Sequence, residues 1–131
     1  MTAKKILIVD DDALLSKTID MCLSKRGHDV KLFYSGVDAV RHMFDEKPDL
    51  VVLDIKLPDC NGWFLTTLLE KLEKLEWAEK VPVIVISVLE PDRKKVSELK
   101  PFAYIQKPFD MGQLTQMVEK SLSEEGPLIS S

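Results

Sequence analysis

Five short apolar stretches, rich in Val, Ile and Leu, recur along the chain. They are Ile6–Val9, Val30–Phe33, Leu50–Leu53, Val83–Ile86 and Ala103–Ile105. Several are apolar at every position instead of alternating with polar residues, which is typical of strands buried on both faces of a parallel sheet. The pattern therefore predicts five strands that pair in parallel.

The segments between these strands repeat apolar residues at helical spacing. The five predicted buried faces consist of Leu15, Ile19, Cys22 and Leu23; Val37, Val40, Met43 and Phe44; Leu65, Leu68, Leu69, Leu72 and Leu75; Val96 and Leu99; and Leu114, Met117, Val118 and Leu122. Gly27 is a suitable stop for the first helix, and Ser35 is a suitable N-cap for the second. Pro101 should end a short fourth helix, Pro91–Leu99, near Lys100.

Strand and helix thus alternate five times, which predicts an α/β fold with a parallel sheet and helices on both faces. The length of 131 residues, of which 45% are hydrophobic, suits one domain with a substantial core. We expect this domain to span residues 1–123. The last residues, 124–131, include Gly126 and Pro127 and are expected to form a flexible C-terminal tail.

Composition excludes several classes of function. The net charge of −4 argues against direct binding to nucleic acid, which normally needs a basic surface. No apolar run is long enough to span a membrane, and the N-terminus lacks the apolar core of a signal peptide. The two cysteines, Cys22 and Cys60, have neither metal-binding nor redox spacing, and free thiols fit a reducing compartment. We therefore expect a cytoplasmic protein.

Polar residues that can carry chemistry follow four of the five predicted strands. They are Asp10, Asp11 and Asp12 after the first strand, Asp54 after the third, Ser87 after the fourth and Lys107 after the fifth. The carboxyl ends of parallel strands meet at one edge of the sheet, where open α/β folds bind their ligands. We therefore expect these side chains to lie close together.

Carboxylates that lie this close together repel one another, and a bound cation would reduce the repulsion. Two carboxylates about 4 Å apart repel by roughly 4 kcal/mol at an effective dielectric of 20, so either their pKa values rise or a cation lies among them. Hard oxygen ligands suit Mg²⁺, while Lys107 and Ser87 can bind phosphoryl oxygens. A carboxylate beside a metal and a lysine can act as a nucleophile and form an aspartyl phosphate.

The ordered set of motifs resembles the receiver domain of two-component response regulators. Ile6–Asp12 resembles its first strand with the acidic pair, and Asp49–Pro58 followed by Gly62 resembles its phosphoacceptor strand and loop. Val83–Ser87 is similar to the strand that carries its Ser/Thr switch, and Tyr104–Phe109 is similar to its Lys-Pro signature. The resemblance runs from about Lys4 to Leu122, and it implies a doubly wound, flavodoxin-like sheet with the strand order 2-1-3-4-5.

The resemblance also implies a role for each site residue. Asp54 would accept the phosphoryl group, Asp11 and Asp54 would bind Mg²⁺ directly, and Asp10 would bind it through water. The remaining implied roles are a backbone carbonyl ligand from Lys56, a phosphoryl contact from Lys107 across a cis Lys107–Pro108 bond, and switch movements of Ser87 and Tyr104. The fourth helix, fifth strand and fifth helix would then change as a surface.

The implied function is a phosphorylation switch, and the chain would catalyse only its own phosphorylation and dephosphorylation. Its partners would be a sensor histidine kinase or a histidine phosphotransfer protein, and a downstream effector protein or domain. We expect no contact with nucleic acid or membrane, and a monomer or weak dimer. Val88, which follows Ser87, is larger than the Ala or Gly common in the family and should slow the access of small phosphodonors.

Other residues are assigned structural roles. Asp12 is expected to cap a helix instead of binding metal, and Trp63 and Trp77 are expected to pack or to contact partners. His28 and His42 are expected to be surface residues without a partner.

Two other functions stay open at this stage. Asp10 and Asp12 also resemble the Asp-x-Asp motif of haloacid-dehalogenase-type phosphatases, in which Asp10 would be the nucleophile, although Leu14 departs from that motif. Alternatively, a receiver-like fold could serve only as a binding module. A flavodoxin-like cofactor protein is disfavoured because no phosphate-binding loop follows the first strand.

Overall fold

Five strands alternate with five helices in the described residues, 3–74 and 80–123, of the computed structural model. The strands are β1 (Lys5–Val9), β2 (Asp29–Phe33), β3 (Leu50–Asp54), β4 (Val83–Ser87) and β5 (Ala103–Gln106). The helices are α1 (Ala13–Ser24), α2 (Gly36–Asp45), α3 (Gly62–Leu72), α4 (Arg93–Leu99) and α5 (Met111–Leu122). All ten predicted elements are therefore confirmed, while Leu75, Trp77 and the expected tail, 124–131, lie outside the described residues.

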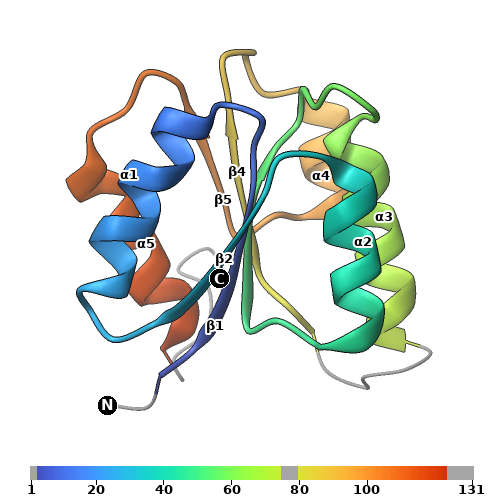
Figure 1. The fold of residues 1–131 in the computed structure, drawn as a ribbon. Helices are drawn as coiled ribbons and strands as arrows, with labels where there is room; N and C mark the ends of the chain where they lie inside the picture. Colours follow the sequence, from blue (N-terminus) through green and yellow to red (C-terminus); the bar gives the residue numbers. More distant parts are fainter. Residues whose placement is uncertain (1–2, 75–79, 124–131) are drawn as a thin grey trace.

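The strands form one parallel sheet in the order β2-β1-β3-β4-β5. This order confirms the doubly wound, flavodoxin-like α/β fold. Figure 1 shows α1 and α5 on one face of the sheet and α2, α3 and α4 on the other. None of the helices in the described part of the chain is both long and apolar enough to cross a lipid bilayer.

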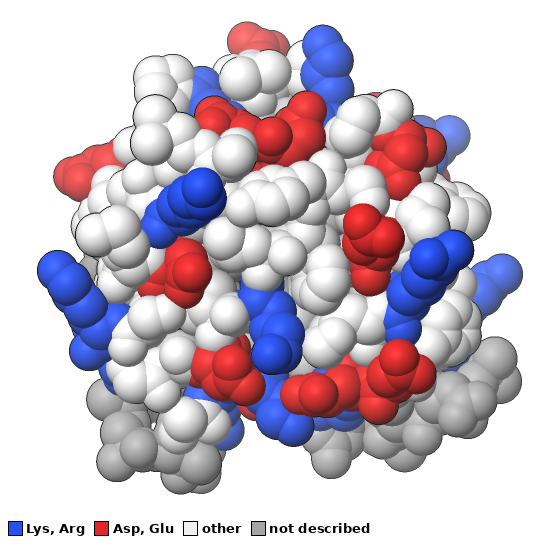
Figure 2. All heavy atoms as spheres, in the orientation of Figure 1, with Lys and Arg blue, Asp and Glu red and all other residues white. Residues whose placement is uncertain are grey.

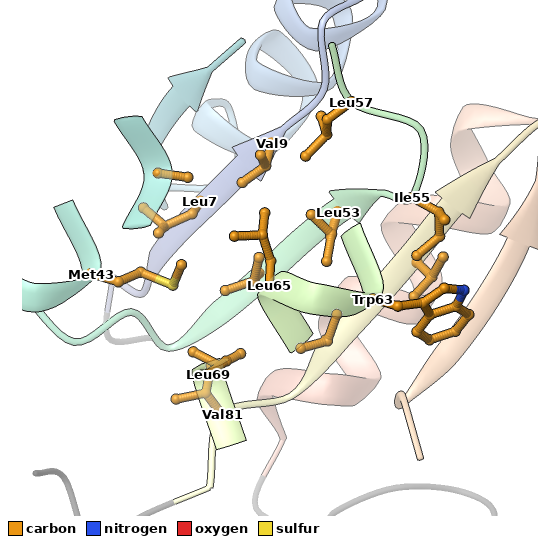
Figure 3. Close-up of a cluster of buried hydrophobic side chains, with 14 of the residues drawn as sticks. Leu7, Val9, Met43, Leu53, Ile55, Leu57, Trp63, Leu65, Leu69 and Val81 are labelled. Carbon is orange, nitrogen blue, oxygen red and sulfur yellow. The ribbon is translucent and has the colours of Figure 1, made fainter. Parts of the chain in front are cut away.

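Each face of the sheet has its own apolar cluster, because successive side chains of a strand point to opposite faces. The first cluster joins the sheet to α2 and α3 and includes Leu7, Val9, Met43, Leu53, Ile55, Leu57, Trp63, Leu65, Leu69 and Val81 (Figure 3). The second joins the sheet to α1 and α5 and includes Ile6, Ile8, Ile19, Leu23, Val52, Ile84, Leu114 and Val118. Packing of these two clusters against the sheet holds the ends of the strands in position.

The prediction for the buried face of α2 is partly wrong. Val37 and Phe44 are 50% and 62% exposed, whereas the helix buries Gly36, Ala39 and Met43. Gly36 faces Cys60 and Leu65, and Ala39 belongs to the first apolar cluster. Large apolar residues alone therefore did not mark the face that packs.

Helix ends follow the sequence signals. The Asp12 side chain accepts a hydrogen bond from the Leu15 amide at 3.0 Å, which confirms it as the N-cap of α1. Gly27 has a φ of 91°, which favours glycine. Lys100 ends α4 in the left-handed region with a φ of 46°, directly before Pro101. The short fourth helix is thus confirmed.

The prediction for the two histidines is wrong. The side chain of His28 is only 3% exposed, and its Nε2 lies 3.1 Å from Glu119 Oε1 on α5. The ring of His42 packs against Phe33, with 5.2 Å between the ring centroids. His28 and Glu119 are 91 residues apart, so their contact depends on the packing of α5 and not on any local pattern.

Candidate functional site

The predicted site residues gather at the edge of the sheet where the strands end. Asp10 and Asp11 follow β1, Asp54 ends β3, Ser87 ends β4 and Lys107 follows β5. This edge lies at the top of Figure 1, and Figure 2 shows acidic side chains there. On the face of the molecule that Figure 2 shows, Lys and Arg side chains are scattered between neutral and acidic ones, so this face carries no continuous basic surface.

Lys107 connects the two buried carboxylates. Its Nζ lies 2.7 Å from Asp10 Oδ2 and 2.9 Å from Asp54 Oδ2. Its backbone amide donates to the Ser87 carbonyl at 2.7 Å, which ties the end of β5 to the end of β4. The Lys107–Pro108 peptide bond is cis, as predicted.

Three carboxylates lie close together at this edge of the sheet. Asp10, Asp11 and Asp54 each offer an oxygen atom, and these atoms all lie within 4.8 Å of one another. Asp10 is fully buried and Asp54 is 5% exposed, whereas Asp11 is open to solvent. Three ionised carboxylates and one ammonium group leave two negative charges. The donor set therefore fits a hard divalent cation such as Mg²⁺ in both charge and ligand chemistry.

Burial controls the titration of this cluster. It raises the pKa of the Asp10 carboxyl above its ordinary value, although hydrogen bonds from Lys107 and from the Asp12 amide oppose the shift. Burial also acts to lower the pKa of the Lys107 ammonium, but its hydrogen bonds to Asp10 and Asp54 outweigh burial, and the net direction is upward. Lys107 therefore remains charged at neutral pH.

The β3–α3 loop folds tightly around Asp54. The amide of Lys56 donates to Asp54 Oδ1 at 2.9 Å, and the Gly62 amide donates to the Ile55 carbonyl at 2.7 Å. An isolated antiparallel bridge pairs Lys56 with Asn61. These contacts place the backbone of Lys56 beside the Asp54 carboxylate, while its side chain is exposed.

Ser87 and Tyr104 meet at the β4–α4 loop. The buried Ser87 hydroxyl accepts a hydrogen bond from the Leu89 amide at 3.1 Å. The Tyr104 hydroxyl donates to the Leu89 carbonyl at 2.8 Å, and its ring stacks on Trp63 with 6.3 Å between centroids. Leu89 therefore links the two predicted switch residues, and Trp63 is a packing residue as expected.

One contact near the site was missed. The carboxylate of Asp59, in the β3–α3 loop, accepts hydrogen bonds from the first two amides of α2. The sequence places Asp59 after Pro58 in a turn, which gave no indication that it reaches a helix 22 positions earlier. Only the spatial neighbourhood of β1, β2 and β3 brings the two segments together.

Comparison with known proteins identifies the family. The family model described as the response regulator receiver domain matches residues 6–119. The chain belongs to this family, and its function is therefore phosphorylation-dependent signalling in a two-component system.

Solved structures of receiver domains match the fold. The receiver domain protein of Methanospirillum hungatei, described as CheY-like, has a TM-score of 0.80 at 28% identity, and the match covers 95% of this chain and 97% of that one. The response regulator DrrB of Thermotoga maritima has a TM-score of 0.81 at 28% identity, with 96% of this chain covered and 55% of that one. The BeF3-activated receiver domain of DrrB has a TM-score of 0.72 at 27% identity, with 90% and 99% covered.

Proposed function

We propose that Asp54 is the residue that accepts the phosphoryl group, with Mg²⁺ held by Asp11 and Asp54, by Asp10 through water, and by the backbone carbonyl of Lys56. The observation that carries this proposal is the position of Lys107 Nζ, which contacts Asp54 and Asp10 within the three-carboxylate cluster. Asp10 and Asp54 both contact Lys107, and of these two Asp54 alone keeps some exposure, 5% against none for Asp10.

In this proposal a carboxylate oxygen of Asp54 attacks the phosphorus atom of a phosphohistidine on a partner kinase or phosphotransfer protein. The P–N bond breaks as the new P–O bond forms, and the histidine leaves with the bonding electrons. Lys107 binds a phosphoryl oxygen and compensates its charge. Mg²⁺ held by Asp11 and Asp54 would further neutralise the phosphoryl oxygens.

The Ser87 hydroxyl is proposed to turn toward the new phosphoryl oxygen. It would then release the Leu89 amide, the group that it contacts in the present state. Because Tyr104 is bonded to the Leu89 carbonyl, movement of this loop would free the tyrosine to swing inward. The surface of α4, β5 and α5 would change as a consequence, and a downstream effector would bind it.

The protein is proposed to act on no external substrate and to catalyse only its own phosphorylation and dephosphorylation. Full burial of Asp10, with its oxygens bonded to Lys107 and the Asp12 amide, disfavours Asp10 as the nucleophile of a phosphatase. The compartment is proposed to be the cytoplasm, since Cys22 and Cys60 are both free thiols.

Intact-mass spectrometry after incubation with Mg²⁺ and acetyl phosphate tests the proposal. The wild type should gain one phosphoryl group that is lost with time and prevented by a chelator, and Asp54→Asn should gain none. An adduct that persists in Asp54→Asn would refute the assignment. Sustained phosphate release from a phosphoester, abolished by Asp10→Asn but retained by Asp54→Asn, would instead indicate the phosphatase.

A further inference from the structure

Asp59, which lies in the β3–α3 loop, caps the N-terminus of α2 with its carboxylate. Its Oδ1 accepts from the Gly36 amide at 2.8 Å, and its Oδ2 accepts from the Val37 amide at 2.9 Å. The first amides of a helix have no partner within the helix, so each needs an external acceptor. The N-cap residue Ser35 makes only a long bond of 3.4 Å, to the Asp38 amide. Asp59 thus provides the shorter bonds at this helix end.

Close packing supports the same contact. A Cβ atom added to Gly36 would lie 2.2 Å from Cys60 Sγ, a separation that real side chains do not tolerate. A side chain at position 36 would therefore force Cys60 to move away from the start of α2. The hydrogen bonds from the two amides also hold the pKa of the Asp59 carboxyl below its ordinary value, which keeps it ionised at neutral pH.

This loop is the segment that shapes the proposed metal site. It begins directly after Asp54 and contains Lys56, whose amide bonds the Asp54 carboxylate. Leu57, one residue further, belongs to the first apolar cluster (Figure 3). The outer part of the loop, at Asp59 and Cys60, is joined to α2 by the contacts described above.

We propose that Asp59 is a positioning residue, which anchors the β3–α3 loop to α2 and thereby holds the Lys56 carbonyl where Mg²⁺ is bound. The inference rests on the proposed function, because it assumes that Lys56 is a metal ligand. Without the anchor, the loop adopts other conformations, and the apparent dissociation constant for Mg²⁺ rises as the competent fraction falls. Losing a helix cap corresponds to about a three- to tenfold change in an equilibrium constant.

Titration calorimetry with Mg²⁺ alone tests this role without any phosphodonor. Asp59→Ala should weaken Mg²⁺ binding about three- to tenfold. Ser35→Ala is the first matched control, since it removes the helix's own cap but leaves the loop anchor, and it should leave the affinity unchanged. Asp92→Ala is the second, because Asp92 caps α4 by accepting from the Lys94 and Lys95 amides.

Breaking the contact from the α2 side gives an independent test. Gly36→Ala should also weaken Mg²⁺ binding, because the new methyl group displaces Cys60 and its loop. Cys60→Ala alone should bind Mg²⁺ normally. The double variant Gly36→Ala with Cys60→Ala should recover most of the affinity, which a general loss of stability in α2 would not predict.

The outcomes separate this inference from the proposed function. If the wild type binds no Mg²⁺, the proposed metal site and the role of Asp59 both fail. If the wild type binds Mg²⁺ and Asp59→Ala binds it equally well, only the role of Asp59 is overturned. Should Asp59→Ala not fold, Asp59→Asn serves in its place, since it keeps one acceptor oxygen and should bind Mg²⁺ more weakly than the wild type. An affinity for Asp59→Asn equal to that of the wild type would equally overturn the role.

Discussion

Asp10 is a carboxylate without solvent contact, and its burial links the stability of the domain to pH. Its pKa is raised above the ordinary value of 3.8, chiefly by burial. The folded protein therefore holds this proton more tightly than the unfolded chain does. The resulting stabilisation is complete below the unfolded-state pKa and is lost as the pH rises through the higher folded-state pKa. At neutral pH the ionised Asp10 thus makes the metal-free protein less stable.

Replacement of Asp10 by Asn should raise the stability of the metal-free protein at pH 7 by on the order of 1 kcal/mol. The amide has nearly the same shape and keeps an acceptor for the Asp12 amide, while Lys107 remains paired with Asp54. Urea unfolding at pH 4 to 8 measures the effect, and the gain should shrink toward acidic pH. Mg²⁺ binding should weaken in the same variant. A variant that is less stable than wild type at pH 7 would contradict this account.

Individual site residues were predictable to different degrees. Asp10, Asp54 and Lys107 each follow an apolar strand, and the parallel arrangement alone brings such residues together. The contact of His28 with Glu119 was not predictable, because it requires the positions of two elements that pack through unrelated residues. The contact of Asp59 with the start of α2 was not predictable either, because it also depends on how two separate segments pack.

At the scale of elements, the junction of β3 and α3 is packed too tightly for any side chain at Gly62. A Cβ atom there would lie 2.6 Å from the carbonyl oxygen of Asp54 and 2.7 Å from the Cα of Ile55. Both neighbours are backbone atoms of the segment that carries the proposed phosphoacceptor. The start of α3 therefore sets the position of Asp54 directly.

Gly62→Ala should destabilise the domain by about 1–3 kcal/mol, because the helix or the strand must move to admit the methyl group. Gly112→Ala is the matched control, since Gly112 also lies in the first turn of a helix and its nearest neighbour would be 3.5 Å away. The control should be neutral or up to about 1 kcal/mol more stable, as alanine favours helices. Equal effects of the two substitutions, measured by thermal unfolding, would show that the close approach at Gly62 is unimportant.

The elements themselves were predicted better than the faces they bury. Continuous apolar runs located β1, β3 and β4 because the sheet lies between two layers of helices and these strands are buried on both faces. For α2, however, the sequence favoured Val37 and Phe44, which are exposed. The buried face instead includes two small residues, Gly36 and Ala39, which a pattern of large apolar side chains does not mark.

At the scale of the whole molecule, the residues of the proposed site lie at one edge of the sheet, whereas the two apolar clusters pack on its two faces. The Methanospirillum receiver domain keeps this fold with a TM-score of 0.80 at only 28% identity. Binding of Mg²⁺ at this edge should nevertheless stabilise the entire domain, because the site residues lie at the ends of β1, β3 and β5.

The midpoint of thermal unfolding should therefore rise with Mg²⁺ concentration. At about 100 times the dissociation constant, linkage predicts roughly 2.7 kcal/mol, or about 10 °C for a domain of this size. Asp11→Asn should remove most of the rise while changing the metal-free midpoint little, since Asp11 is exposed. A wild-type midpoint that does not respond to Mg²⁺ would contradict the proposed site.

The contact between Lys107 and Asp10 spans 97 residues of sequence. During synthesis, the acidic pair leaves the ribosome long before the lysine that compensates its charge. A partly made chain cannot assemble this site until Lys107, its last contributing residue, has been added. A chain that ends before Lys107 therefore lacks the ammonium group that contacts Asp10 and Asp54, however well its first strands are folded.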